Sequence, residues 1–144
     1  MEREELARTN GYPDEILSQL LEFERAVRED DLTGAVLKTL YERGAPIYNV
    51  GFRLPASLRF VEFLHCLVSD GLAVSWELWD ATVEAADGDH VIHGRSTEVW
   101  RRQDDGIWKM AYDHASIAVE LELAVQATAD VVGMGGPRPA AAMS

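Results

Sequence analysis

The chain has 144 residues, of which 25 are acidic and 13 basic, and its formal net charge is −12. Its scattered lysine and arginine residues argue against binding to nucleic acids or anionic membrane surfaces, which requires clustered positive charge, and no apolar run reaches the about 18 residues that span a bilayer. The single cysteine, Cys66, excludes an intrachain disulfide and a thiolate metal cluster, and the polar start of the chain is unlike a secretory signal, so we expect a cytoplasmic protein.

The first half of the chain has the apolar spacing of helices. Pro13, followed by two acidic residues, is typical of a helix start, and Asp70-Gly71 is typical of a helix end. Between these signals, hydrophobic residues recur at intervals of three and four. The pattern predicts helices over 16–29, 32–42 and 58–68, and a short strand over 47–50.

The second half has the pattern of a strand meander. Asp87-Gly88 predicts a two-residue hairpin turn, and Asp104-Asp105-Gly106 predicts a second turn. Helices followed by strands indicate an α+β fold in a single domain over 1–132. The predicted elements of this half are strands over 72–86, 89–102 and 107–119, a helix over 118–132, and a flexible tail over 133–144.

The hairpin turns determine which residues share a face of the sheet. With Asp87-Gly88 as the turn, Asp80 lies opposite Arg95, and the second hairpin then places Thr97 opposite Asp113. One predicted face holds Trp76, Leu78, Asp80, Thr82, His93, Arg95, Thr97, Val99, Ala111, Asp113 and Ile117. The other holds Trp79, Val83, Ile92, Glu98, Trp100, Trp108, Met110, Tyr112 and His114. Neither face is plainly polar, so we expect both to be covered.

The polar residues of the first face have ordinary interpretations as well as functional ones. Asp80 and Arg95 fit a simple cross-strand ion pair, and Asp113 and His93 fit solvated strand positions. The sequence has no metal-binding histidine motif, no nucleophile elbow and no phosphate-binding glycine pattern. We therefore expect neither a metal nor a cofactor.

The segment GRSTEVWRRQDDGIWKMAYDHAS, residues 94–116, resembles the closing hairpin of the nuclear-transport-factor-like superfamily. That group includes ketosteroid isomerases, SnoaL-like polyketide cyclases, limonene epoxide hydrolase and the association domain of calmodulin-dependent kinase. Residues 20–36 resemble its first two helices, and the similarity covers about residues 16 to 119. The resemblance implies a cystatin-like α+β barrel, in which N-terminal helices pack on the concave face of a cone-shaped, curved antiparallel sheet.

The resemblance also assigns the two faces of the sheet. It implies that the face with Asp80, Arg95 and Asp113 lines a deep apolar pocket beneath the helices. The aromatic face would then form a homodimer, through Trp79, Trp100, Trp108 and Tyr112.

Two activities of the superfamily match the sequence incompletely. The ketosteroid isomerase tyrosine, base and acid would fall on Phe23, Asn49 and Thr97, which lack those capacities, so that mechanism is disfavoured. The Asp–Arg–Asp group of the epoxide hydrolase would fall on Arg95, Thr97 and Asp113, with a threonine in place of one acid. Tyr48 and Asn49 would lie near its water-binding pair.

The remaining hypothesis is a cofactor-independent isomerase, cyclase or lyase of secondary metabolism, acting on a small apolar or polyketide-like carbonyl compound. Asp113 would be the general base, Arg95 or His93 would orient the substrate oxygen, and Asp80 would supply a second carboxylate. The alternative is a non-catalytic ligand-binding or dimerising association module of the same fold. The predicted ligand-contacting residues are Trp76, Leu78, Thr97, Val99, Tyr48, Asn49, Phe23 and Phe63.

Overall fold

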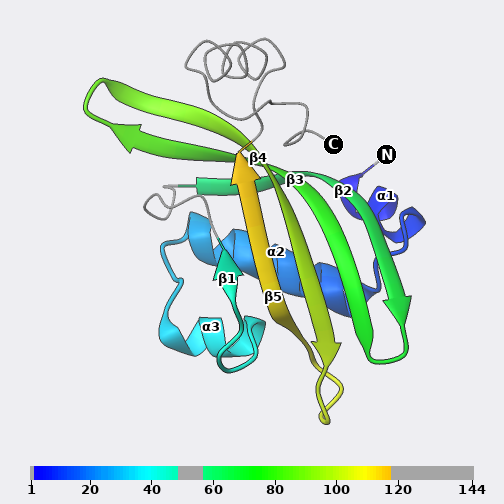
Figure 1. Ribbon diagram of the computed structural model, residues 1–144. Helices are drawn as coiled ribbons and strands as arrows, with labels where there is room; N and C mark the ends of the chain where they lie inside the picture. The colour runs from blue at the N-terminus through cyan, green and yellow to red at the C-terminus, as the bar shows by residue number, and fades with distance from the viewer. Residues whose placement is uncertain (1, 49–56, 118–144) are drawn as a thin grey trace, which may run out of the picture.

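The computed structural model describes residues 2–48 and 57–117, which form three helices and a five-stranded sheet (Figure 1). The strand order is β1-β5-β4-β3-β2, and all pairings are antiparallel except that of β1 with β5. The elements are α1 (Arg3–Thr9), α2 (Asp14–Arg28), α3 (Gly34–Leu40), β1 (Ile47–Tyr48), β2 (Ser57–Ser69), β3 (Leu72–Ala85), β4 (Gly88–Arg102) and β5 (Trp108–Ile117).

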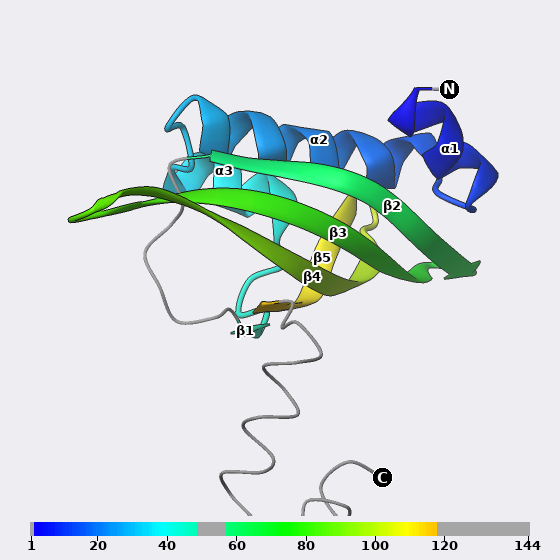
Figure 2. The same cartoon turned by 90° about the horizontal axis from the view of Figure 1, so that it is seen from above.

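The helices form one layer on the concave face of a curved, unclosed sheet (Figure 2). This arrangement confirms the predicted α+β class and the placement of the N-terminal helices. We call the opposite face of the sheet the outer face. None of the helices in the described part of the chain is long and apolar enough to cross a lipid bilayer.

The core between the helices and the sheet is rich in aromatic side chains. Trp100 is fully buried, and Trp79 and Trp108 retain only 4% and 5% of their exposure. Apolar residues of α2 cover them from above, among them Ile16 and Leu20. Burying a large apolar side chain stabilises the folded chain by about 1.5–3 kcal/mol. The fold with these tryptophans on the helix-covered side of the sheet is therefore favoured. The sequence-based assignment of the two faces is therefore wrong.

The β3–β4 hairpin turns one residue earlier than predicted. Ala85 pairs with Gly88, so the two-residue turn is Ala86-Asp87. Gly88 has a φ of 119°, a conformation that favours glycine, but it adopts this as the first residue of β4 and not inside the turn. The shift places Asp80 opposite His93 and corrects the predicted pairing of Asp80 with Arg95.

The β4–β5 hairpin begins as predicted and then changes register. Arg102 pairs with Trp108, but an extra residue, Ala111, shifts the pairing from Val99 onward. Such a β-bulge moves every following side chain of the bulged strand to the other face. It brings Asp113 opposite Glu98, beneath the helices, and corrects the predicted pairing with Thr97.

The third predicted helix, over 58–68, is wrong, because this segment is the edge strand β2. Two register irregularities interrupt its pairing with β3, and its buried residues are Phe60, Phe63 and Cys66. Each bulge adds a residue to the usual two-residue alternation, so burial recurs every third residue. That spacing imitates one face of a helix.

The N-terminal helix α1, which the sequence did not predict, is fastened to β2 by an ion pair. The Arg3 guanidinium binds both carboxylate oxygens of Glu24 on α2, at 2.6 and 2.7 Å, and donates to the Phe60 carbonyl at 2.6 Å. Glu24 accepts the Phe60 amide at 2.8 Å. One guanidinium and one carboxylate thus join α1, α2 and the bulged strand.

The α1–α2 connection satisfies further backbone groups of β2. The Asn10 side-chain amide donates to the Phe63 carbonyl at 2.8 Å, and the Asn10 carbonyl accepts the Cys66 amide at 3.0 Å. Gly11, with φ of 96°, lies so close that a Cβ there would be 2.5 Å from the Cys66 carbonyl oxygen. The backbone therefore needs glycine at this position.

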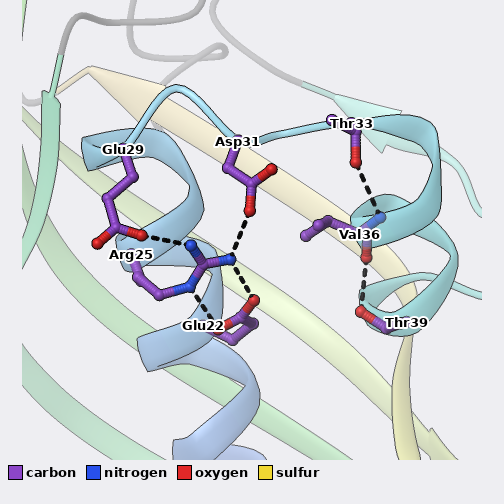
Figure 3. Close-up of polar contacts among 7 residues, drawn as sticks. All are labelled: Glu22, Arg25, Glu29, Asp31, Thr33, Val36 and Thr39. Carbon is purple, nitrogen blue, oxygen red and sulfur yellow. Dashed lines mark hydrogen bonds and ion pairs between the residues drawn. The ribbon is translucent and has the colours of Figure 1, made fainter.

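The α2–α3 connection is ordered by charge and by a helix cap (Figure 3). The Arg25 guanidinium contacts the carboxylates of Glu22, Glu29 and Asp31, and the nearest Glu22 oxygen lies at 2.6 Å. Thr33 caps α3 by accepting a backbone amide of the first turn at 3.3 Å. The predicted helix over 118–132 and the tail over 133–144 lie outside the described residues.

Candidate functional site

Three acidic side chains from adjacent strands meet beneath the helices. They are Glu77 on β3, Glu98 on β4 and Asp113 on β5. Glu98 lies within hydrogen-bonding reach of both other carboxyl groups. Glu77 is fully buried and Glu98 is 3% exposed, whereas Asp113 is half-buried. We call these three side chains the carboxyl row.

Two serines serve the inner part of the row. Ser96 donates to Glu77 at 3.3 Å, and Ser75 donates to Glu98 at 3.2 Å. The Trp100 indole donates in turn to the Ser75 hydroxyl at 2.9 Å. Among the residues that the structure describes, every buried side-chain nitrogen and oxygen has a hydrogen-bond partner. The row is therefore a fully bonded polar strip inside an aromatic core.

A tyrosine lies at each end of the carboxyl row. Tyr12, in the α1–α2 connection, has its hydroxyl 2.8 Å from Glu77 Oε2 and 2.6 Å from the Trp76 carbonyl oxygen. Tyr41, directly after α3, donates to Asp113 Oδ2 at 2.6 Å. Burial raises the pKa of both phenols, and the adjacent carboxyl groups raise it further, so both tyrosines remain protonated.

Burial dominates the electrostatics of the carboxyl row. It raises the pKa of Glu98 well above the ordinary value, and the neighbouring Glu77 raises it further. Burial also raises the pKa of Glu77 and of Asp113, although hydrogen bonding with Glu98 opposes the shift at both groups and the Tyr41 hydroxyl opposes it at Asp113. Because like charges this close disfavour joint ionisation, ionisation of one carboxyl group of the row hinders ionisation of its neighbour.

The predicted catalytic residues do not assemble. Asp80 and His93 lie on the outer face, where Asp80 Oδ1 and His93 Nδ1 are 2.5 Å apart, and Arg95 is exposed opposite Leu78. Asp113 lies on the helix-covered face. The prediction that Asp80, Arg95 and Asp113 share one face is therefore wrong, because the bulge at Ala111 separates them.

The predicted ligand-contacting residues are divided between the two faces. Four of them lie half-buried on the outer face: Trp76, Leu78, Thr97 and Val99. Phe63 is in the core, and Phe23 packs half-buried against the core from α2. The Tyr48 backbone pairs with His114 in β1, and Asn49 lies outside the described residues.

The predicted dimer surface is also divided. Trp79, Trp100 and Trp108 are core residues beneath the helices, so the prediction of a homodimer through the aromatic face is wrong. Tyr112 lies on the outer face, paired with Val99. The three tryptophans lie in the core because burying their large apolar surface beneath the helices gives a larger hydrophobic free-energy gain than leaving it on the outer face.

Sequence reasoning missed Glu77 as a member of the site and gave Glu98 to the dimer face. A signal for both was present. Ser75-Trp76-Glu77 and Ser96-Thr97-Glu98 have the same Ser-x-Glu pattern in two strands of one hairpin. Antiparallel pairing sets each serine opposite the other strand's glutamate. Within the described residues, no group of three or more His, Cys, Asp or Glu side chains is arranged to hold a metal ion.

Comparisons with known proteins identify the fold. No model of a protein family matches the sequence, and no curated protein matches it significantly. Among solved structures, a nuclear transport factor 2-like superfamily protein from Salmonella enterica is similar, with a TM-score of 0.64 and 15% identity over 75% of this chain and 92% of that one. The chain has the nuclear transport factor 2-like fold.

Two further structures with this fold illustrate its range. The CaMKII hub of S. rosetta has a TM-score of 0.62 and 17% identity, over 75% of this chain and 98% of the hub chain. A candidate ketosteroid isomerase from Shewanella frigidimarina has a TM-score of 0.55 and 18% identity, over 69% of this chain and 92% of that one. At these identities the likeness concerns the fold of the nuclear transport factor 2-like proteins and not an activity.

Proposed function

We propose that this chain is a cofactor-independent acid–base enzyme of the isomerase, cyclase or lyase type, with Asp113 as its general base. The substrate class is a small apolar, polyketide-like carbonyl compound. The observation that carries the proposal is the position of Asp113, which is the half-buried end of an otherwise buried carboxyl row.

The surroundings of Asp113 suit proton transfer. A general base is most effective when its pKa lies near the working pH, and burial raises the pKa of Asp113 from its ordinary acidic value. The Tyr41 hydroxyl holds Oδ2 at 2.6 Å and fixes the orientation of the carboxyl group. Ala115, two residues further along the same face of β5, and Phe23 of α2 are half-buried apolar residues that pack against the core, and such a substrate requires apolar surface of this kind.

The proposed reaction uses these positions in two steps. Asp113 removes a proton from a carbon next to the substrate carbonyl, and the electron pair of that C–H bond moves to the carbonyl oxygen as an enolate. The enolate then takes this proton from Asp113 at another carbon of its conjugated system, which gives an isomer. Alternatively, the enolate re-forms the carbonyl, a double bond forms between the two neighbouring carbons, and the bond to the leaving group breaks as Asp113 protonates that group, which gives a lyase product. Glu98, hydrogen-bonded behind Asp113, is a positioning residue in this scheme.

The test measures proton exchange and does not require the natural substrate. A panel of small apolar ketones is incubated with the protein in D₂O, and exchange of the α-protons is followed by NMR. We expect exchange with the wild type, and a loss of at least about 100-fold in Asp113→Asn. Asp80→Asn, which changes the same residue type on the outer face, is the matched control and retains the rate. Equal exchange rates in the wild type and in Asp113→Asn would show that Asp113 is not the general base.

The second candidate is a non-catalytic ligand-binding or association module. It is supported by the complete internal hydrogen bonding of the carboxyl row and by the aromatic filling of the core, with Phe63, Trp79 and Trp100 all buried. Line broadening of the ketones by the wild type without any α-proton exchange would favour this candidate.

We also propose that a second copy of the chain covers the outer face. The centre of this face holds half-buried Trp76, Leu78 and Val99, and Leu67 beside them is 55% exposed. This surface is more apolar than a sheet face in water usually is.

A further inference from the structure

Glu77 and Glu98 lie at the centre of the core, behind the residue to which the proposed reaction assigns catalysis. Their residue exposures are 0% and 3%. The salt bridges among the described residues all lie elsewhere, so neither carboxyl group has a cationic partner there. An ionised carboxylate in such surroundings costs several kcal/mol, and the usual outcome is that the group stays neutral.

The hydrogen bonds around Tyr12 support a proton on Glu77. The Tyr12 hydroxyl has one proton and two close oxygen neighbours, the Trp76 carbonyl at 2.6 Å and Glu77 Oε2 at 2.8 Å. A carbonyl oxygen only accepts, so the shorter contact takes the tyrosine proton. The Tyr12 oxygen is then left to accept a proton from Glu77. The contact between Glu77 and Glu98 likewise requires a proton between two acceptor oxygens.

Among the residues that the structure describes, the titratable groups that face the pair from neighbouring elements are neutral or acidic. Tyr12 faces it from the α1–α2 connection and Cys66 from β2, and burial raises the pKa of this thiol to about 12. Asp113 and, behind it, Tyr41 face the pair from β5 and from the end of α3. His114 lowers the pKa of Asp113 from the opposite face of the strand. Nothing in this set can compensate a negative charge on the pair.

We propose that the Glu77–Glu98 pair is a proton-dependent lock on the core: the helices close over the sheet while the pair keeps its protons, and rising pH weakens the closure. The lock is independent of whether the chain is an enzyme.

The direction of the pH effect follows from proton linkage. In the unfolded chain both glutamates ionise near pH about 4.3, whereas in the folded chain burial raises the pKa of both. Their contribution to stability is therefore complete below about pH 4.3 and decreases as pH rises toward the folded-state values. For each proton that only the folded state holds, the unfolding equilibrium constant increases about tenfold when the pH rises by one unit.

The experiment is urea unfolding of the full chain at several values between about pH 5.5 and about pH 8. Glu98→Gln keeps the shape of a protonated glutamate but has no proton that it can lose as the pH rises. For each pH unit, we expect the unfolding equilibrium constant of the wild type to increase by a factor about ten times larger than that of this variant. Glu84→Gln, an exposed glutamate of β3, is the matched control and keeps the wild-type dependence. Equal pH dependence in Glu98→Gln and wild type would overturn the lock.

A second measurement uses the wild type alone and remains decisive if Glu98→Gln fails to fold. Infrared spectroscopy of the folded protein at neutral pH detects the carbonyl stretch of neutral carboxylic acids separately from that of carboxylates. We expect a neutral-acid band that shifts in D₂O and disappears on unfolding. Its absence from the folded protein at neutral pH would overturn the proposal.

Discussion

Gly94 and Trp79 are cross-strand neighbours in the β3–β4 hairpin. The Trp79 indole occupies the space that a side chain at position 94 would need. A Cβ at position 94 would overlap the indole ring of Trp79. Trp79 is 4% exposed, and its ring is enclosed by the core. The glycine is therefore needed for its missing side chain and not for an unusual backbone angle.

We predict that Gly94→Ala lowers the free energy of unfolding by about 3 kcal/mol, because the added methyl group overpacks a closed core. Urea unfolding monitored by fluorescence measures the change. Gly71→Ala, at a position where a Cβ meets nothing within 4 Å, is the matched control and changes stability by less than about 0.5 kcal/mol. A loss in Gly94→Ala no larger than in this control would contradict the assignment.

At the scale of elements, the edge strand β2 depends on a contact from the start of the chain. Glu24 has a side chain only 7% exposed, and Arg3 neutralises it while remaining 23% exposed. Burial raises the pKa of Glu24, but the hydrogen bonds from Arg3 and from the Phe60 amide, with the charge of Arg3, lower it by more. The ionised pair therefore stabilises the folded chain at neutral pH.

We predict that Arg3→Met lowers the free energy of unfolding by about 2–3 kcal/mol, because it leaves a buried carboxylate unpaired. Glu24→Gln in the same background should recover part of the loss. The contribution of Glu24 is present above the ordinary glutamate pKa of about 4.3 and is lost as pH falls through its lower folded-state pKa.

Arg8→Met is the control for this prediction, since it breaks the exposed pair of Arg8 with Asp14 on the same helix layer. Such surface pairs contribute little to stability. If Arg3→Met and Arg8→Met had equal effects in urea unfolding, the buried pair would not be what fastens α1 to β2.

The sequence predicted the elements whose burial follows a regular period. The helix predicted over 16–29 is α2, that over 32–42 contains α3, and the three-stranded meander is present with bounds shifted by one or two residues. In these segments hydrophobic spacing and turn residues indicate the same structure, so local pattern was sufficient.

Two errors, the helix predicted over 58–68 and the face predicted for Asp113, occurred where bulges interrupt the period. Two irregularities in β2 gave a strand the spacing of a helix, and one in β5 reversed the face of Asp113. Bulges are placed by tertiary contacts, such as those of Arg3 and Asn10 with the β2 backbone, which lie over fifty residues away in sequence. The carboxyl row was missed for the same reason, because only the correct register sets Glu98 beside Asp113.

At the scale of the whole molecule, the apolar outer face is the surface on which the proposed dimer depends. We predict a homodimer through this face, measured by sedimentation equilibrium. Leu67→Lys, which places a charge at a side chain 55% exposed on β2, should weaken association at least tenfold, because an interface core disfavours charge.

Leu6→Lys is the matched control, since Leu6 is 44% exposed on α1 in the helix layer. It should leave the dimer intact. A wild-type mass equal to that of one chain at micromolar concentration would contradict the dimer.

The fastening of β2 has a consequence for the behaviour of the protein at high concentration. An open sheet usually exposes two edges at which another strand can add, and repeated addition produces fibrils. Here the edge groups of Phe60, Phe63 and Cys66 are already bonded to Glu24, Arg3 and Asn10. At the opposite edge, the β5 backbone is partly bonded as well, since its Met110 carbonyl accepts the Glu42 amide at 2.9 Å and its Asp113 amide donates to the Pro46 carbonyl at 3.0 Å. The contacts that hold the first helices in place thus also protect this sheet against templated growth.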